Sequence, residues 1–209
     1  MDKCVFCCGS HVANEYDEPF YARYGYKALS SVGAINEGWV LIIPDEHCAS
    51  SKKYFSVSSY LDFVKTVKIG VQEEYGECVV FEHGPKSAGS LTGCGVDHAH
   101  LHIVPVNFYD FEEAVGKAGK EWKKIRLDDV EAYVRENEYL MYSNSEDWDS
   151  GLVNIHILPE SESQFFRKVV ALISGASEFY DYKKYKFTDN AINTKRRLHK
   201  LFHSCCEVA

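Results

Sequence analysis

Short apolar runs alternate along the chain with longer segments of helical spacing. The apolar runs end at prolines, glycines or polar residues and predict strands at 27–29, 38–44, 78–81, 98–106 and 139–142. Apolar residues three and four apart predict helices at 56–74, 111–126 and 163–174, and a glycine-rich loop is expected at 84–95. The basic segment 183–203 is expected to lie on the surface, and no internal repeat is expected. Strands in close succession favour antiparallel pairing with a helix on one face, so the predicted fold class is α+β.

The composition limits the partners and the cellular location. With 209 residues and 45% hydrophobic residues, the chain is long enough for a substantial core. Asp and Glu number 31 against 23 Lys and Arg, a net charge of -8 that argues against duplex nucleic acid as a partner. A polyanionic small substrate would therefore need a local positive site. Residues 1–4 show no leader pattern and no long apolar run follows, so we expect a cytoplasmic protein without a membrane partner.

Three histidines alternate with apolar residues near the middle of the chain. Side chains in a strand point to alternate faces, so His98, His100 and His102 would share one face while their apolar neighbours enter the core. One interpretation is a catalytic three-histidine metal site. The other is nucleophilic catalysis by one imidazole, with its neighbours contacting phosphate oxygens.

The segment 98–104 resembles the signature of the histidine triad (HIT) superfamily, in which apolar residues separate three histidines. The glycine-containing segment 93–97 is similar to the phosphate loop that precedes this signature. The segment 38–47 is similar to the family strand that ends in proline and a nearby histidine. Cys4-Val5-Phe6-Cys7 resembles the opening of the zinc-containing branch. The resemblance covers about residues 1–106.

This resemblance implies a HIT-like catalytic domain at 1–109, with an antiparallel sheet and a covering helix, followed by a mixed C-terminal extension at 110–209. It implies that His100 attacks phosphorus and forms a phosphoramidate, which water or a second acceptor then releases. His102 would contact the phosphate or the leaving group. A hydrogen bond from the other ring nitrogen of His100 to a main-chain carbonyl would fix the required tautomer.

The CxxC pair Cys4 and Cys7 has the spacing of two thiolates on one tetrahedral ion, although ordinary thiols are the alternative. The resemblance supplies His47 and His98 as the other two ligands. The closed set implies structural Zn²⁺, which orients the triad and leaves no position for an activated water.

Several residues are candidates for substrate and phosphate binding. The resemblance places Gly93, Cys94 and Gly95 in the phosphate loop, where Cys94 stands in the place of a usual glutamine. Ser31 stands where an aspartate usually holds the ribose hydroxyls, so the sugar contact would lack charge assistance. The segment 81–84 replaces an asparagine-containing turn, and His83 within it is either a phosphate contact or a surface loop residue.

The C-terminal half adds two further candidates. Ser163 is expected to cap a helix, with Gln164 and Arg167 on the face that could meet phosphate. An ordinary amphipathic helix is the alternative. The aromatic tract 179–185 could stack a base or sugar, or could simply pack the extension.

Three functions are consistent with these patterns. The first is a hydrolase or nucleotidyltransferase acting on phosphate anhydride, ester or phosphoramidate bonds of a small phosphorylated substrate, in particular a nucleotide, through His100. The second is a zinc-stabilised nucleotide- or partner-binding module with little turnover. The third is the catalytic three-histidine metal site. Because HIT proteins are often dimers, a homodimer is one expectation, although the extension could cover the usual interface.

Overall fold

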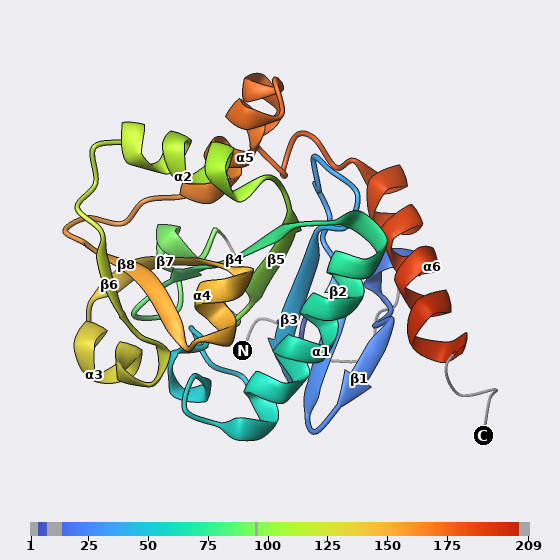
Figure 1. Cartoon of the computed structure of the whole chain (residues 1–209), viewed down its shortest axis with the longest axis horizontal. Helices are drawn as coiled ribbons and strands as arrows, with labels where there is room; N and C mark the ends of the chain where they lie inside the picture. The colour runs from blue at the N-terminus through green and yellow to red at the C-terminus, as the bar shows by residue number, and fades with distance from the viewer. Residues whose placement is uncertain (1–3, 8–13, 95, 205–209) are drawn as a thin grey trace.

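The computed structural model describes residues 4–7, 14–94 and 96–204. Within them lies one eight-stranded sheet in which all neighbouring strands are antiparallel, in the order β1-β2-β3-β5-β4-β7-β8-β6 (Figure 1). The strands are β1 (Tyr21–Arg23), β2 (Tyr26–Ser30), β3 (Val40–Pro44), β4 (Cys78–Gly84), β5 (Leu101–Pro105), β6 (Lys123–Arg126), β7 (Glu138–Asn144) and β8 (Leu152–Leu158). The helices are α1 (Ser58–Tyr75), α2 (Phe108–Lys117), α3 (Val130–Val134), α4 (Ser145–Asp149), α5 (Phe165–Ile173) and α6 (Thr188–Ser204). The predicted α+β class is confirmed.

Helices cover both faces of this sheet, whereas the sequence predicted a helix on one face. One buried cluster joins the sheet to α1, α3, α4 and α6, with Val67 and Leu198 among its members. The other cluster joins the opposite face to α2 and α5 through residues such as Phe111 and Phe166. Figure 1 shows α1 running across the front of the sheet with α6 beside it. The chain is therefore a three-layer arrangement with the sheet in the middle.

Local sequence explains where the central elements begin and end. Helix α1 buries Phe63, Val67 and Val71, which recur at helical spacing, and it stops because Gly76 takes a left-handed φ of +88°. Strand β3 is buried along its whole length and ends at Pro44, which cannot donate to a further ladder bond. These elements hold the middle of the sheet, where the histidine-bearing strand lies.

Two sequence predictions are wrong in their extent. The helix expected at 111–126 ends at Lys117, because Gly119 at φ +68° turns the chain into the charged edge strand β6. The strand expected at 98–106 begins only at Leu101, so His98 and His100 precede it. The expected inward direction of the apolar neighbours is confirmed, since Leu101 and Ile103 are fully buried.

The second half of the chain continues the sheet of the first half. Strand β7 pairs with β4 over six positions, from Val79 opposite Asn144 to Gly84 opposite Tyr139. The sheet thus crosses the boundary expected at residue 109, and the extension is built onto the same sheet.

The β7–β8 pair repeats the β4–β5 pair. In the first pair, His102 on β5 lies opposite β4. In the second pair, His156 on β8 lies opposite β7 at the corresponding position. The segment 100–105 reads His-Leu-His-Ile-Val-Pro and the segment 154–159 reads Asn-Ile-His-Ile-Leu-Pro. Asn154 therefore occupies the position of His100, and the second pair lacks the central histidine. This repeat is only six residues long, which is why the sequence alone did not reveal it.

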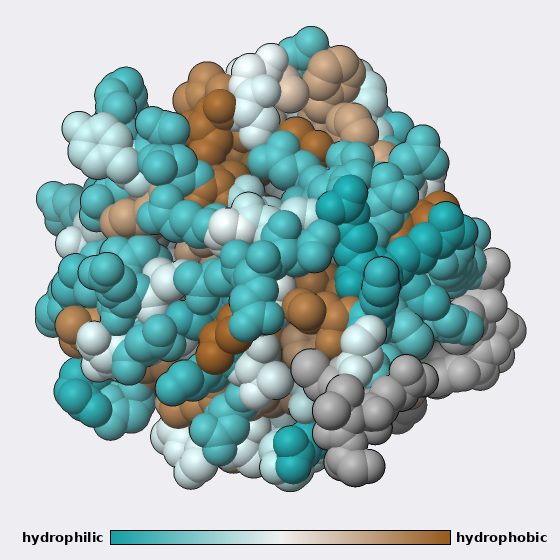
Figure 2. Space-filling view, turned by 45° about the vertical axis from the view of Figure 1, so that its right-hand side comes forward, coloured by the Kyte–Doolittle hydropathy of each residue, from teal (hydrophilic) through white to brown (hydrophobic). Residues whose placement is uncertain are grey.

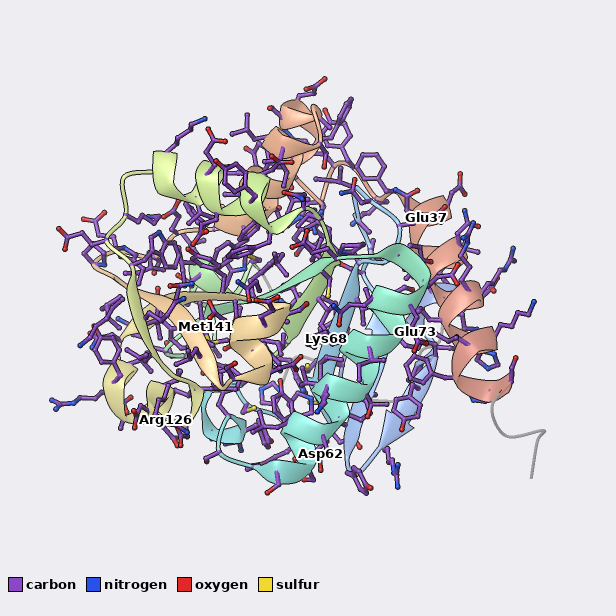
Figure 3. The ribbon with its side chains drawn as sticks, viewed as in Figure 1. Glu37, Asp62, Lys68, Glu73, Arg126 and Met141 are labelled. Carbon is purple, nitrogen blue, oxygen red and sulfur yellow. The ribbon has the colours of Figure 1, made fainter. Side chains whose placement is uncertain are left out.

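Two charged side chains are buried away from the histidines. Lys68 is 1% exposed and reaches from α1 towards α4, where Nζ lies 2.8 Å from Oδ2 of Asp149 (Figure 3). Glu82 on β4 is also 1% exposed and accepts hydrogen bonds from the Ser51 amide at 2.6 Å and the Tyr139 hydroxyl at 2.5 Å. Burial raises the pKa of Glu82 even though these bonds act in the opposite direction.

The surface seen in Figure 2 is mainly hydrophilic, with hydrophobic residues gathered in small patches. Among the described residues, no helix has both the length and the apolar character needed to cross a bilayer.

Candidate active site and metal cluster

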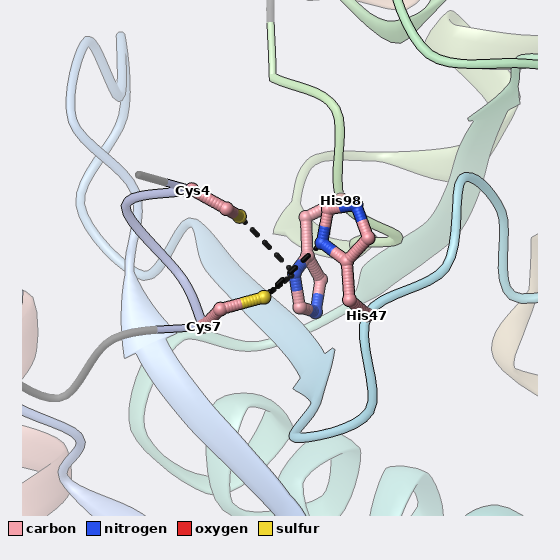
Figure 4. Close-up of side chains that lie close together, drawn as sticks. All are labelled: Cys4, Cys7, His47 and His98. Carbon is pink, nitrogen blue, oxygen red and sulfur yellow. Dashed lines mark hydrogen bonds between the residues drawn. The ribbon is translucent and has the colours of Figure 1, made fainter. Parts of the chain in front are cut away.

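Four potential metal ligands from three separate segments meet beside the histidine strand (Figure 4). Cys4 and Cys7 come from the N-terminal turn, His47 follows β3, and His98 precedes β5. Their ligand atoms all lie within 4.8 Å of one another. The Cys4 and Cys7 sulfurs lie 3.3 and 3.4 Å from Nδ1 of His98, and the Cys7 sulfur lies 3.1 Å from Nδ1 of His47. The structure therefore brings together the four residues that the sequence grouped.

The donor set fits a tetrahedral ion. Metal–ligand bonds of about 2.0–2.3 Å in tetrahedral geometry separate the donor atoms by about 3.3–3.8 Å, close to the spacing seen here. Nε2 of His98 donates to the Pro44 carbonyl at 2.7 Å, which leaves Nδ1 without a proton and directed at the cysteines. A main-chain carbonyl on the distal nitrogen is the usual support of a metal-bound imidazole.

A cavity of about 650 Å³ lies next to this cluster, on the sheet face that α2 and α5 cover. Its wall includes six of the residues predicted for catalysis or phosphate binding: Ser31, His83, Cys94, His100, His102 and Arg167. The volume suits a ligand of the size of a mononucleotide. The cavity is thus where the predicted site residues converge.

His100 is 9% exposed at the wall of this cavity, and its tautomer is fixed. Nδ1 donates to the His98 carbonyl at 2.7 Å, the hydrogen bond that the sequence analysis anticipated. The ring's remaining nitrogen, Nε2, therefore carries a lone pair. Burial lowers the pKa of His100, partly offset by the bond to His98, so the imidazole is neutral near pH 7.

His102 is held in the opposite tautomer by a tryptophan. The indole Nε1 of Trp39, which can only donate, lies 2.9 Å from Nδ1 of His102. Nε2 of His102 must then carry the proton and is a hydrogen-bond donor. The ring also stacks on Phe81 at 4.6 Å between centroids. Burial, together with His100, keeps the pKa of His102 well below its usual value.

His83 offers a second donor. It is buried on β4, and its Nε2 accepts the amide of Phe166 at 3.2 Å, at the start of α5. The proton must then be on Nδ1, which has no hydrogen-bond partner within the described residues. Burial lowers the pKa of His83 to about 3, so it stays neutral. A buried donor without a partner is costly and is suited to a ligand oxygen.

Arg167 supplies positive charge from the second half of the chain. It is 3% exposed, donates to the main-chain carbonyls of Gly33 and Tyr180, and lies 4.6 Å from the Trp39 ring centroid. No carboxylate pairs with it among the described residues. Burial lowers its pKa to about 10, which still leaves the guanidinium charged at neutral pH.

The loop before the triad is fastened by a glutamate from β7. Oε1 and Oε2 of Glu138 accept from the Ser90 and Thr92 hydroxyls at 2.5 and 2.6 Å. Burial opposes ionisation, yet these bonds lower the pKa of Glu138 overall. Gly93 ends the short 3₁₀ turn η3 (Leu91–Gly93) without lining the cavity, and Gly95 lies outside the described residues.

Gln164 differs from its predicted role. It does not line the cavity. Its main-chain N–H donates to the Cys94 sulfur at 3.2 Å, its side-chain Nε2 donates to Asp181, and its Oε1 accepts from the main-chain N–H of Tyr182. The cap predicted for Ser163 is also wrong, because α5 starts after Gln164, which takes a left-handed φ of +59°. Gln164 thus connects Cys94 to the segment that follows α5.

Sequence reasoning missed several groups in this site, among them Trp39, Asp17 and Lys186. The Trp39 bond to His102 depends on the pairing of β3 with β5, which places Leu41 opposite His102. Asp17 and Lys186 line the cavity from segments outside every recognised motif. Of these, Trp39 could have been predicted from the sequence. It lies two residues before Leu41 in a predicted strand, so the two side chains share a face of that strand.

Comparison with known proteins adds little to this geometry. No family model matches the chain, and no curated protein matches it. A solved structure to which it is similar is a hypothetical histidine triad nucleotide-binding protein from Sulfolobus tokodaii strain7. The identity is 24%, the match covers 49% of this chain and 68% of that chain, and the TM-score is 0.38. Because so low a score describes only a partial likeness, the function must be argued from the residues of the site.

Proposed function

We propose that the chain is a hydrolase or nucleotidyltransferase of nucleotides or nucleotide-like phosphates, acting through a covalent intermediate on His100. The observation that carries this proposal is the pairing of opposite tautomers in one cavity. His100 keeps a lone pair on Nε2 because Nδ1 bonds a carbonyl, and His102 keeps a proton on Nε2 because Nδ1 accepts from Trp39. A nucleophile and a donor are therefore set side by side, with ring centroids 5.0 Å apart.

In the proposed reaction, Nε2 of His100 forms a bond to phosphorus while the bond from phosphorus to the leaving group breaks. The leaving group departs with the bonding electron pair. His102 donates a hydrogen bond to a phosphate oxygen or to the leaving atom, and Arg167 balances the charge that develops on the phosphoryl oxygens. An oxygen of water or of a second acceptor then forms a bond to phosphorus and gives up its proton to solvent or to the departed leaving group. The bond from phosphorus to Nε2 breaks, its electron pair returns to Nε2, and His100 is restored as neutral imidazole.

We further propose that Cys4, Cys7, His47 and His98 hold a structural Zn²⁺. Such an ion, having four protein ligands, would supply no activated water and would hold the N-terminal turn against the triad. His98 contributes to both features, since its ring is a ligand while its carbonyl fixes the tautomer of His100.

Two other functions have less support. A three-histidine catalytic metal site would need the three imidazoles to converge, but Nδ1 of His98 faces the cysteines and Nδ1 of His102 faces Trp39. A pure binding module would not need a buried, neutral His100 with a free lone pair. It remains the alternative that the experiment below separates from catalysis.

The test is intact-protein mass spectrometry after brief quenching without acid, which preserves a phosphoramidate. The protein is mixed with adenylylated and other nucleotidylated compounds. His156→Ala is the matched control, because this residue holds the corresponding place in the repeated strand pair outside the cavity. We expect a nucleotidyl adduct in the wild type and in His156→Ala and none in His100→Ala. Ligand binding without any adduct or product would overturn the catalytic proposal in favour of a binding module.

A further inference from the structure

The cavity is chemically uneven. Hydrogen-bond donors gather around the triad, where His102 and Arg167 line the wall beside the nucleophile His100. Asp17 and Ser31 line it with oxygen acceptors instead, and Asp17 is the single acidic residue among the described lining residues. A phosphate is suited to the donors and would be repelled by the carboxylate. The wall at Asp17 must therefore meet a different part of a ligand.

Asp17 is held in place and has one oxygen to spare. It ends the 3₁₀ turn η1 (Glu15–Asp17), where Oδ2 accepts from the main-chain and side-chain nitrogens of Asn14, both at 3.0 Å. Within the described residues, Oδ1 has no hydrogen bond and the carboxylate forms no ion pair. Because Oδ2 is fixed by two bonds, the position of Oδ1 is set before any ligand arrives.

The turn itself is fastened to the rest of the fold. The Tyr16 carbonyl accepts from the Ser30 hydroxyl at 3.5 Å, which places η1 at the end of β2. Glu15 pairs with Arg196 and Glu18 with Lys195, both at distances of 2.8–2.9 Å, so α6 holds both ends of the turn. Asp17 thus belongs to a wall built from β2 and η1, which the ion pairs to α6 hold in place.

The acceptors define what they can recognise. A carboxylate only accepts hydrogen bonds, and the Ser31 hydroxyl donates its proton to the Val32 carbonyl at 3.3 Å, which leaves its oxygen as an acceptor as well. A ligand must therefore offer donors. A cationic donor is disfavoured because Lys27, Arg167 and Lys186 line the same cavity. Neutral hydroxyl groups satisfy both conditions.

We propose that Asp17 determines specificity by accepting hydrogen bonds from the vicinal hydroxyls of a phosphorylated sugar, such as the ribose of a nucleotide. This proposal rests on the proposed function, because the phosphate of the same ligand would lie at His100. It assigns sugar recognition to a residue outside all the motifs of the sequence, while Ser31 contributes a second, uncharged acceptor.

The test measures binding, so that it does not depend on turnover. Isothermal titration calorimetry gives the affinities of the four ribonucleoside monophosphates and of their 2′,3′-dideoxy counterparts for wild type, Asp17→Asn, Asn14→Ala and Glu18→Gln. We expect the wild type to bind at least one ribonucleotide about tenfold or more tightly than its dideoxy form, the range of a charge-assisted hydrogen bond. In Asp17→Asn this preference should fall to about twofold or less, through loss of ribonucleotide affinity alone. Glu18→Gln, which alters the same turn outside the cavity, should keep the preference.

Three results would overturn this proposal. The first is a wild type that binds none of the ribonucleotides or does not distinguish them from the dideoxy forms. The second is an equal loss for both ligand classes in Asp17→Asn. The third is a full loss of the preference in Asn14→Ala, since this variant removes only the side-chain bond to Oδ2 and keeps both the carboxylate and the main-chain bond that holds it. Failure here is separable from failure of the proposed function, because a His100 adduct formed without sugar discrimination would leave the catalytic proposal standing.

Discussion

Replacing Trp39 with phenylalanine tests how the histidine pair is organised. Trp39 is fully buried, and its Nε1 donates to Nδ1 of His102 at 2.9 Å. Phenylalanine keeps an aromatic ring in the core but removes this donor. Nδ1 of His102 then becomes a buried acceptor without a partner, and the constraint on the tautomer is lost.

The expected loss of stability has two sources. Leaving a buried acceptor unpaired costs about 1–3 kcal/mol. The smaller ring adds a packing defect of about 1 kcal/mol, comparable to a small core truncation. A total of about 2–4 kcal/mol lowers the melting temperature of a chain of this size by roughly 5–15 °C. If the proton of His102 stabilises the transition state, its misorientation raises the activation free energy. An increase of about 1.4 kcal/mol slows turnover about tenfold.

Trp122→Phe is the matched control. Trp122 lies on the same side of the sheet and packs against Tyr142 with ring centroids 4.8 Å apart. Its Nε1 has no hydrogen-bond partner among the described residues, so phenylalanine removes ring volume there without breaking a bond. Thermal unfolding of both variants separates the hydrogen bond from the packing loss, and nitrogen chemical shifts of the histidine rings report the tautomer of His102.

An unchanged His102 tautomer in Trp39→Phe would refute the reasoning, because Trp39 would then not be what fixes it. Equal destabilisation in Trp39→Phe and Trp122→Phe would show that the bond contributes nothing beyond ring volume.

Two further predictions concern the metal cluster and a buried carboxyl. Cys4→Ser should lower the zinc content of the purified protein, measured by elemental analysis, from about one ion per chain to well below one. Cys78→Ser is the control, because Cys78 is a buried thiol that does not belong to the cluster, and this variant should retain the ion. Equal zinc content in the two variants would exclude the cluster as the zinc site. Because burial raises the pKa of Glu82, the folded chain holds this proton at pH values where the unfolded chain has released it, so stability falls as pH rises from about 4.5 to the folded pKa, by up to about 1.4 kcal/mol per pH unit. Glu82→Gln should remove that slope when urea unfolding is followed across pH, and parallel curves for the two proteins would contradict the assignment.

The sequence predicted much of the first half of the fold because local signals there agree. Strand β3 is apolar and stopped by Pro44, and α1 has helical spacing and a glycine stop. In the second half, β6 carries Lys123 and Lys124 on an exposed edge, and this charge pattern is equally typical of a helix surface. β8 includes the polar Asn154 and was missed altogether.

The candidate site also combines features that the sequence predicted with features that depend on how the strands pair. Cys4, Cys7, His47 and His98 were grouped through the resemblance, and the structure brings them together. Arg167 lines the cavity, although the sequence argument for its phosphate contact, which stays a prediction, rested on a helix cap that does not form. The fixed tautomer of His102 needed the register between β3 and β5, which no local pattern contains.

The interior position of β4 has a consequence for biosynthesis. Val79 of β4 pairs with Asn144, 65 residues later in the chain. At about 5–20 residues per second, the ribosome needs about 3–13 s to add that length. During this interval the apolar β4 strand lacks one of its two neighbours and exposes unpaired amide and carbonyl groups, the kind of edge that invites pairing with another nascent chain. Folding of the histidine-bearing half is therefore coupled to the arrival of β7, and the period of greatest aggregation risk ends only when Asn144 has left the exit tunnel.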